Sequence, residues 1–341
     1  MKLRPLYPVC VCEMGKALLF LLAVVIFCRG SVLDECEWSG GRPVAGLVKR
    51  DMTTKLFKAR YPKGVPEHYL ELRTYRDTLS LELQRIGYLE DCLTLYKISQ
   101  QISGKGIFID VGANVGACSI PMAASGMTTL AFEPMPSNLH YFTKSVLVNQ
   151  HRLGNLPKLH VFAAALGATS KYITLHSQSD NFGNSMLGTF IRDSDSRLPA
   201  REASIESTVR VLTYDEAIAS LPSNGSVALM KIDVQGAEAS VLQGMNGTFA
   251  SHSSYLPRYV FTEIDPVRLW GQNSSSAQLL GLLKAYGYIP NPLKGVSGVS
   301  AEPSWDKLAA DLDESAKTKG TNAATNLLAR LEKDTWPIDL R

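Results

Sequence analysis

The feature that most constrains the fold is an alternation of short apolar runs with segments of helical periodicity in the middle of the chain. The apolar runs predict strands at Ile107–Val111, Thr128–Glu133, Leu159–Ala164, Val227–Val234 and Tyr259–Ile264. Helices are predicted at Val115–Ala124, Ser137–Val148, Ala237–Met245 and Ala277–Tyr286. This alternation predicts an α/β fold, in which a parallel sheet carries helices on both faces.

The flanking segments predict further parts of a chain of 341 residues, which is long enough for one large domain with appendages. Residues 31–65 have little periodicity and predict a linker or stalk, and residues 66–103 predict a helical N-terminal layer. The main domain is then expected at 104–290, followed by a helical tail at 291–341 that contains "WDKLAADLDESAK" and "NAATNLLARLEK". Inside the domain, Ser177–Ser207 is polar and aperiodic, which predicts a functional or disordered loop.

The first 30 residues are typical of a targeting segment. A basic start precedes Ala17–Cys28, an unbroken apolar run that suits a signal-peptide core and is short for a membrane span of ~20 residues. Cleavage before Ser31 is one outcome, and retention as a single-pass signal anchor is the other. Arg29 favours the anchor, because a charge beside the cleavage point hinders cleavage and ends a short span. We expect the secretory pathway, with a lumenal domain in the endoplasmic reticulum or Golgi or a secreted protein.

The cysteines beyond this segment are Cys36, Cys92 and Cys118, and they lack the spacing of a zinc site. If the domain is lumenal, a disulfide between Cys36 and Cys92 is predicted, because Cys118 is expected on a helix packed against the sheet. The histidines form no metal-spaced pair, so no metal ligand is predicted. Three N-glycosylation sequons agree with a lumenal domain, and they begin at Asn224, Asn246 and Asn273.

The charge balance bears on the class of partner. The chain has 35 basic and 32 acidic residues, for a formal net charge of +3. Nucleic-acid-binding proteins carry a clustered basic excess, so this balance argues against a nucleic-acid partner.

The motif "DVGANVG" lies where the first predicted strand turns into a helix. A P-loop is excluded because no lysine follows Gly116. A dinucleotide fingerprint is disfavoured because Asn114 occupies the position of the glycine that lets the backbone approach a pyrophosphate. The remaining interpretation is a tight turn at Gly112 beside a ligand that has no pyrophosphate. Asp110 before the turn suits a ligand that carries positive charge.

The next strand supplies a second acid. Glu133 follows the apolar run "TLAF", 21 residues after Gly112, where a carboxylate can accept the hydroxyls of a ribose. The turn, the acid and the ribose acceptor together predict S-adenosylmethionine as the cofactor. The predicted cofactor-binding residues are Asp110, Gly112, Asn114, Gly116 and Glu133.

Several motifs carry a resemblance to a known family. "FIDVGANVG", "AFEPMPSNLHYFTKSVLVN", "VRVLTYDEAI" and "KIDVQGAE" occur in the order and spacing of the FkbM-like methyltransferases, over roughly Gly104 to Tyr288. Gln235 replaces a common Glu of the family, and Tyr214 replaces a common Leu. The resemblance implies a Rossmann-like, doubly wound sheet and methyl transfer, commonly to a hydroxyl of a sugar or secondary metabolite. A non-catalytic secretory protein with this fold and a dinucleotide-dependent oxidoreductase are the rival interpretations.

The catalytic candidates follow from the strand ends. Ligands of open α/β sheets bind beyond the carboxyl ends of the strands, and the acids there include Asp233 and Glu263. We expect Asp233 to be the base or acceptor-positioning residue, with a helix cap as its alternative role and Glu263 as the second candidate base. Lys231 shares a strand face with Asp233 and is either catalytic or part of an ion pair. The expected partner of the site is a hydroxylated small molecule or glycan.

Overall fold

A computed structural model gives the structure of the chain. It describes residues 54–332, with the exception of 63, 75–77, 103–105, 154–155, 157, 179–180, 188–203, 220, 222–224, 293–303 and 321–323. The predicted targeting segment, most of the predicted stalk and Cys36 lie outside the described residues. Within that described part, no helix is both long and apolar enough to cross a membrane.

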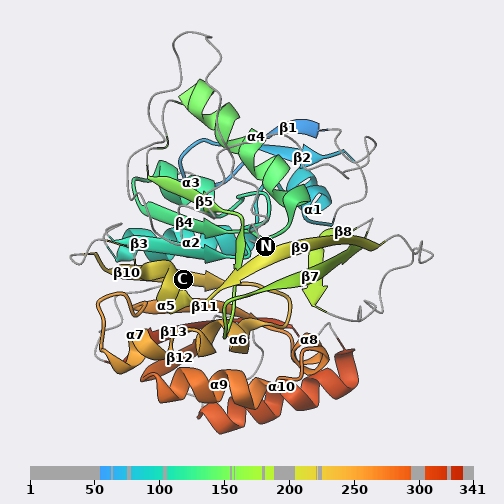
Figure 1. Ribbon diagram of the computed structural model, residues 1–341. Coiled ribbons are helices and arrows are strands. Elements are labelled where there is room, and N and C mark those ends of the chain that lie inside the picture. Colours follow the sequence, from blue (N-terminus) through green and yellow to red (C-terminus); the bar gives the residue numbers. More distant parts are fainter. Residues whose placement is uncertain are drawn as a thin grey trace, which may run out of the picture.

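The central element is a sheet of seven strands (Figure 1). Its order is β12 (Tyr288–Pro292), β13 (Thr325–Leu331), β11 (Tyr259–Ile264), β10 (Val227–Ile232), β3 (Ile107–Val111), β4 (Thr128–Phe132) and β5 (Leu159–Phe162). The strands from β11 to β5 are parallel, and β13 is antiparallel to both of its neighbours. All five predicted strands lie side by side in this doubly wound, mostly parallel sheet. The α/β, Rossmann-like prediction is therefore confirmed.

Helices cover both faces of the sheet because successive side chains of a strand point in opposite directions. On one face, Ile109 and Val111 of β3 pack in a core with α6 (Glu238–Gln243), α9 (Ser276–Ala285) and α10 (Trp305–Lys319). On the other face, Phe108 of the same strand packs with α2 (Glu90–Gln101), α3 (Ser119–Ala124) and α4 (Pro136–Leu153). Figure 1 shows α9 and α10 together on one side of the sheet and α4 on the other. The helices α5 (Tyr214–Ile218), α7 (Asn246–Ala250) and α8 (Pro266–Gly271) are short.

The segments that flank the main sheet are only partly helical. Helices α1 (Thr78–Ile86) and α2 confirm the helical part of the predicted N-terminal layer. Ahead of them, however, β1 (Thr54–Lys58) and β2 (Tyr69–Arg73) form an antiparallel pair, with Leu70 and Leu72 buried at a spacing of two residues. At the other end α10 is helical as predicted, but the prediction of a helix over "NAATNLLARLEK" is wrong, because this segment contains β13.

A second sheet interrupts the alternation between β5 and β10. It has the order β6 (Ala164–Leu166), β9 (Ser204–Leu212), β7 (Lys171–Gln178) and β8 (Asn181–Leu187). The prediction of a structureless loop is therefore wrong for β8 and the start of β9. The polar sequence there lacks the apolar alternation on which strand prediction depends, whereas backbone pairing with β7 needs no particular side chains. Residues 104–290 thus contribute to two sheets rather than one.

The disulfide links Cys92 and Cys118, with their Cα atoms 4.7 Å apart, so the predicted pairing of Cys36 with Cys92 is wrong. Helix α3 begins at Ser119, so Cys118 lies in the turn before it rather than inside the helix. There it meets Cys92, which lies in the first turn of α2. The bond ties the N-terminal layer to the turn that follows β3.

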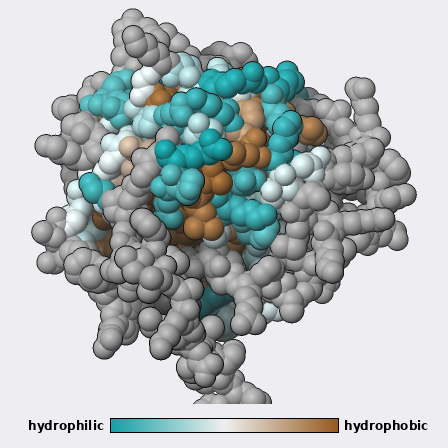
Figure 2. All heavy atoms as spheres, turned by 90° about the horizontal axis from the view of Figure 1, so that it is seen from above, coloured by the Kyte–Doolittle hydropathy of each residue, from teal (hydrophilic) through white to brown (hydrophobic). Residues whose placement is uncertain are grey.

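Seen from above, the described residues show a group of hydrophobic side chains bordered by hydrophilic ones (Figure 2). Large exposed hydrophobic residues are scattered over the described part, and they are Leu56, Leu81, Leu147, Tyr172 and Trp270. Scattered residues of this kind are normal on a protein surface and do not mark a docking site.

Candidate functional site

The turn after β3 depends on a glycine that lies close to a neighbouring strand. Gly112 has a φ of 82°, and a Cβ atom at this position would overlap the carbonyl oxygen of Asp233. The N–H groups of Gly112 and Ala113 both donate to the carbonyl of Phe132, at 3.0 and 3.1 Å. The glycine is therefore required because the ends of β3 and β10 are in contact. Gly116 (φ 84°) is required for packing, because a Cβ there would overlap the ring of Phe142.

Glu133 lies directly beyond β4 and holds this turn. Its Oε2 accepts the N–H of Asn114 at 2.8 Å, and its Oε1 accepts the N–H of Met135 at 2.8 Å and the amide of Asn138 at 3.2 Å. The side chain is buried, and burial raises the pKa of Glu133 above its ordinary value, while these hydrogen bonds and Arg73 act in the opposite direction. An ionised carboxylate has about four lone-pair positions, so one on Oε2 remains for a ligand.

A pocket opens beside this turn. Gly112, Asn114 and Glu133 line one part of it, and Asp233 and Gln235 line another. The second sheet supplies another part of the wall, which includes Ala165, Leu166, Ile173, Leu175 and Val211. Pockets with largely apolar walls and a few polar groups are typical of small-molecule sites. The pocket brings together three of the predicted cofactor residues and one predicted catalytic residue.

The other predicted residues lie behind or beside the pocket. Asp110 is fully buried; the hydroxyl of Ser119 donates to its Oδ2 at 2.6 Å, and its Oδ1 lies 3.5 Å from the Lys231 ammonium. Asp110, Lys231 and Glu263 are outside the pocket lining, as is Gly116. Asp110 therefore supports the turn and Lys231 from within the core, and a direct contact of Asp110 with a cofactor stays a prediction.

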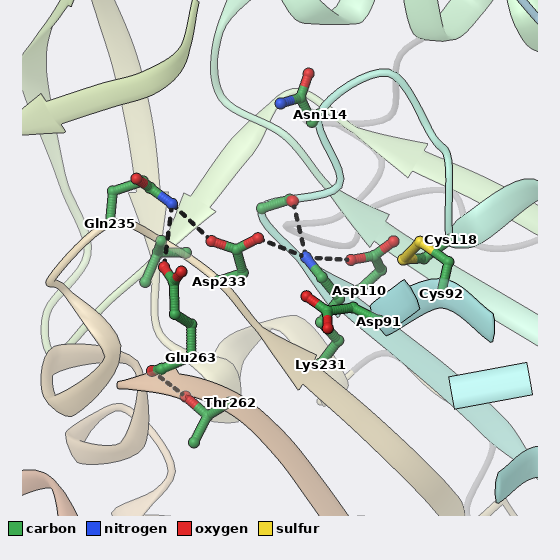
Figure 3. Close-up of polar contacts among 12 residues, drawn as sticks. Asp91, Cys92, Asp110, Asn114, Cys118, Lys231, Asp233, Gln235, Thr262 and Glu263 are labelled. Atoms are coloured by element: carbon green, nitrogen blue, oxygen red, sulfur yellow. Dashed lines mark hydrogen bonds and ion pairs between the residues drawn. A yellow bond between two sulfur atoms is a disulfide. The ribbon is translucent and has the colours of Figure 1, made fainter. Parts of the chain in front are cut away.

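Lys231 connects Asp110 of β3 with Asp233, which follows β10 (Figure 3). Its Nζ lies 3.2 Å from Asp233 Oδ2 and donates to the Gly112 carbonyl at 3.3 Å. Burial lowers the pKa of Lys231, but the charges of Asp233 and Asp110 outweigh it, and the net pKa is raised. Of its two predicted roles, membership of an ion pair therefore fits the contacts of Lys231 with Asp233 and Asp110.

Asp233 is the acid that the pocket exposes. Its side chain is 35% exposed, and its Oδ1 accepts the Gln235 amide at 2.8 Å (Figure 3). Burial opposes ionisation, but the Lys231 charge and the Gln235 amide outweigh it and hold the pKa of Asp233 below its ordinary value. A helix cap, its alternative role, does not fit, because the turn before α6 is bound by Glu238, which accepts the N–H groups of Val234 and Gly236.

Glu263 lies on the far side of Gln235. The Gln235 amide lies 3.4 Å from Glu263 Oε2, so one side chain bridges the two acids. Burial and the charge of Asp233 raise the pKa of Glu263 to about 8. Gln235 has a φ of 59°, the left-handed conformation that brings its side chain back over the end of β10.

Sequence reasoning missed the residues that reach the site from distant segments. Asp91 of α2 accepts the Asn326 amide of β13 at 2.7 Å, and burial and the charge of Asp233 raise the pKa of Asp91 to about 6. Asn138 in "PSNLH" follows Glu133 closely and was a possible signal, whereas Asp91 and Asn326 had none. Among the described residues, no group of three or more His, Cys, Asp or Glu side chains could hold a metal ion.

The strand order, with a pocket beyond the carboxyl ends of the strands, is that of a Rossmann-like α/β protein. The family model described as "Methyltransferase FkbM domain" matches residues 110–290, more than half of the chain. The chain therefore belongs to the family of FkbM-domain methyltransferases, and its cofactor is S-adenosylmethionine.

A curated relative is "Methyltransferase 1" of the fungus Beauveria bassiana (strain ARSEF 2860), which is 25% identical over 150 residues. The aligned part spans 40% of this chain and 57% of that protein. Similar solved structures include the magnesium protoporphyrin IX methyltransferase of Synechocystis PCC 6803 with bound S-adenosylmethionine, at 10% identity and a TM-score of 0.37, covering 74% of this chain and 82% of that one. Another is the 16S rRNA N2 G1207 methyltransferase of T. thermophilus, at 14% identity and a TM-score of 0.38, covering 82% and 51% of the two chains.

The residues present fit the cofactor. Glu133 keeps one acceptor position directed at a pocket that is otherwise largely apolar, as a ribose beside a purine requires. The turn at Gly112 leaves no pyrophosphate cradle, and S-adenosylmethionine has no phosphates. Glu133 and Asn114 would hold the nucleoside part, and the end near Asp233 would receive the sulfonium end.

Proposed function

We propose that the protein is an O-methyltransferase that acts on a hydroxyl of a sugar, glycan or small metabolite. The observation that carries this proposal is the position of Asp233 on the pocket wall, where Lys231 keeps it ionised. A hydroxyl is a poor nucleophile and gains from a nearby carboxylate, whereas a neutral amine needs no such base.

In this proposal the cofactor and the side chains of the protein have different chemical roles. The bound cofactor supplies a sulfonium methyl group that is open to direct displacement. Asp233 accepts a hydrogen bond from the acceptor hydroxyl and takes its proton as the new carbon–oxygen bond forms, which is typically worth about 10²–10⁴ in rate. The walls of the pocket hold acceptor and methyl group in line, and orientation of this kind can contribute ~7–11 kcal/mol.

Lys231 and Glu263 have supporting roles in this proposal. Lys231 lies between Asp110 and Asp233 and is 8% exposed, so it sets the charge of Asp233 without reaching the pocket. Glu263 is outside the pocket lining, and its carboxyl group is bound to Asp233 through the Gln235 amide.

A methyl-transfer screen tests the proposal. The full chain would be incubated with S-adenosylmethionine carrying a labelled methyl group and with panels of glycans, hydroxylated metabolites and amines. Label on the oxygen of a hydroxylated acceptor, located by NMR of the product, is the expected result. Methylation of amines alone would contradict O-methylation. Stabilisation by NAD(P)H instead of S-adenosylhomocysteine would favour an oxidoreductase.

We also propose that the domain works on the lumenal side of the secretory pathway, either anchored or secreted. The disulfide of Cys92 and Cys118 supports this location, because such bonds persist in oxidising compartments. Asn273 is exposed in a sequon, so a glycan at this residue is expected in expressed full-length protein. An Asn273→Gln variant should lose the corresponding endoglycosidase-sensitive mass, and a purely cytosolic, unglycosylated pool would contradict the proposal.

A further inference from the structure

Strand β2 of the N-terminal layer is bound to helix α4 by side-chain hydrogen bonds at alternate residues. The N–H of Tyr69 donates to Asn149 Oδ1 at 2.9 Å, and the Asn149 amide donates back to the Tyr69 carbonyl at 2.6 Å. Two residues further along the strand, the N–H of Glu71 donates to the hydroxyl of Ser145 at 2.8 Å. These contacts hold the N-terminal layer against the domain, far from the pocket.

The third contact between β2 and α4 joins Arg73 to Asn138, which in turn contacts Glu133. Arg73 donates to Asn138 Oδ1 at 2.9 Å, and Asn138 Nδ2 donates to Glu133 Oε1 at 3.2 Å. Arg73 and Asn138 are 4% and 3% exposed, so both bonds are shielded from water. The guanidinium of Arg73 also lies 4.6 Å from the ring centroid of Tyr141, which fixes its plane.

The chemistry of the three groups fixes the direction of this series. A guanidinium only donates hydrogen bonds, and an ionised carboxylate only accepts them. Asn138 can satisfy both neighbours only with its oxygen toward Arg73 and its nitrogen toward Glu133. Asn138 therefore fixes the position of Glu133 Oε1 by donating to it. Glu133 Oε2 remains directed at Asn114 and the pocket.

We propose that Arg73 is a positioning residue for cofactor binding: through Asn138 it orients the Glu133 carboxylate and keeps it charged for the ribose. This inference rests on the proposed role of Glu133 as the ribose acceptor. Arg73 lies outside residues 110–290, so the N-terminal layer completes the cofactor site of the family domain. Charge-assisted hydrogen bonds are roughly twice as strong as neutral ones, so a protonated Glu133 would bind the ribose less well.

Arg73 also affects the pH at which Glu133 loses its charge. Burial raises the pKa of Glu133, and Arg73 is the charged residue that lowers it. Cofactor affinity should fall as pH falls, because Glu133 becomes protonated. Without Arg73 the pKa of Glu133 is higher, so this loss of affinity should begin at a higher pH. The elements around Glu133 and Arg73 also carry the ionisable groups of Glu71, His140, Lys144 and Lys171. Burial and the charges of Lys144 and Arg73 lower the pKa of His140, so its ring is neutral above about pH 6.5.

The experiment compares two variants that weaken the same β2–α4 contact. Arg73→Met removes the contact that reaches Glu133, and Asn149→Ala removes the contact at the other end of the series. Affinity for S-adenosylhomocysteine would be measured by calorimetry from pH 6.5 to 8.5, with thermal unfolding measured in parallel. Arg73 lowers the pKa of Glu133, so Arg73→Met should weaken binding severalfold at pH 6.5 and less at pH 8.5. Asn149→Ala should lower stability and leave affinity unchanged at both pH values.

Further variants keep the test decisive. Arg73→Lys retains the charge and should recover part of the low-pH affinity. If Arg73→Met does not fold, Asn138→Ala should weaken binding at both pH values and more strongly at pH 6.5, because it removes the hydrogen bond that orients Glu133 and also lowers its pKa. Unchanged affinity in folded Arg73→Met, or equal losses in Arg73→Met and Asn149→Ala, would overturn the proposal. Failure of the wild-type protein to bind S-adenosylhomocysteine would instead count against the cofactor assignment itself.

Discussion

Glu133 is the single residue on which cofactor affinity should depend most. Replacement by Ala removes a buried acceptor for the ribose and leaves the N–H groups of Asn114 and Met135 unpaired. Hydrogen bonds to charged groups contribute about 1.5–3 kcal/mol, so Glu133→Ala should weaken S-adenosylmethionine binding roughly tenfold to a hundredfold. Calorimetry on the folded variant measures this, and Glu133→Gln is the matched control because it keeps the size and one acceptor. Unchanged affinity would show that the ribose assignment is wrong.

Asp233 should act on turnover rather than on cofactor binding. Asp233→Asn keeps the shape and the contact with Gln235 but cannot take a proton. We expect the turnover number to fall by about 10²–10⁴ while affinity for S-adenosylhomocysteine changes little. Single-turnover assays and calorimetry separate the two effects. Equal losses of turnover and affinity would make Asp233 a cofactor ligand instead of a base.

The pH profile discriminates between the two candidate bases. The pKa of Asp233 is below its ordinary value, so Asp233 is already deprotonated at neutral pH and gives a rate that falls only in acid. The pKa of Glu263 is about 8, so a rate that depends on deprotonated Glu263 would rise through that pH. We expect kcat to stay level between about pH 6 and 9. A profile that climbs through about pH 8, and becomes level in Glu263→Gln, would assign the base to Glu263.

At the scale of elements, the disulfide should stabilise the layer of α2 against the turn before α3. Cys92 and Cys118 are separated by 26 positions, and closing a loop of that length contributes about 3.5 kcal/mol in the chain-entropy description. The double variant Cys92→Ser/Cys118→Ser should lose a free energy of unfolding of that order, measured by urea denaturation. Wild-type protein in a strong reductant is the control and should approach the variant. Equal stability of oxidised and reduced wild type would contradict this expectation.

The elements that could be predicted from sequence are those with local signals. β3, β10 and β11 are short and predominantly apolar, because strands in the middle of a covered sheet are buried on both faces. β13 is also buried along Leu327–Leu331, but its Leu, Ala and Arg residues favour helices, and only pairing with β11 and β12 makes it a strand. Local propensity was overridden there by contacts distant in sequence.

The residues of the site also differ in whether a local sequence signal marks them. Glu133 and Asp233 could be found because each directly follows an apolar strand, and the topology brings such positions to one edge of the sheet. Arg73 reaches Glu133 across 60 positions of sequence, and no local pattern marks such a contact. The bridging role of Gln235 also depends on its backbone conformation, which the sequence "VQG" does not specify.

At the scale of the whole molecule, the fold extends beyond the family match. β13 lies between β11 and β12, and α10 packs in the same core as α9. A chain that ends at residue 290 should therefore not fold, whereas one that ends at residue 332 should keep the wild-type melting transition. Circular dichroism with thermal melting compares the two. A cooperative transition in the shorter chain would show that β13 is dispensable.

The interior position of β13 also sets the order of events during synthesis. The ribosome makes this strand after all the others, yet its place in the sheet separates two strands that were made earlier. Until residue 331 has left the exit tunnel, the outer edge of β11 has no partner strand and β12 cannot join the sheet through its described neighbour. Exposed strand edges attract chaperones and other nascent chains. Each newly made molecule can therefore complete its sheet only after β13 has emerged.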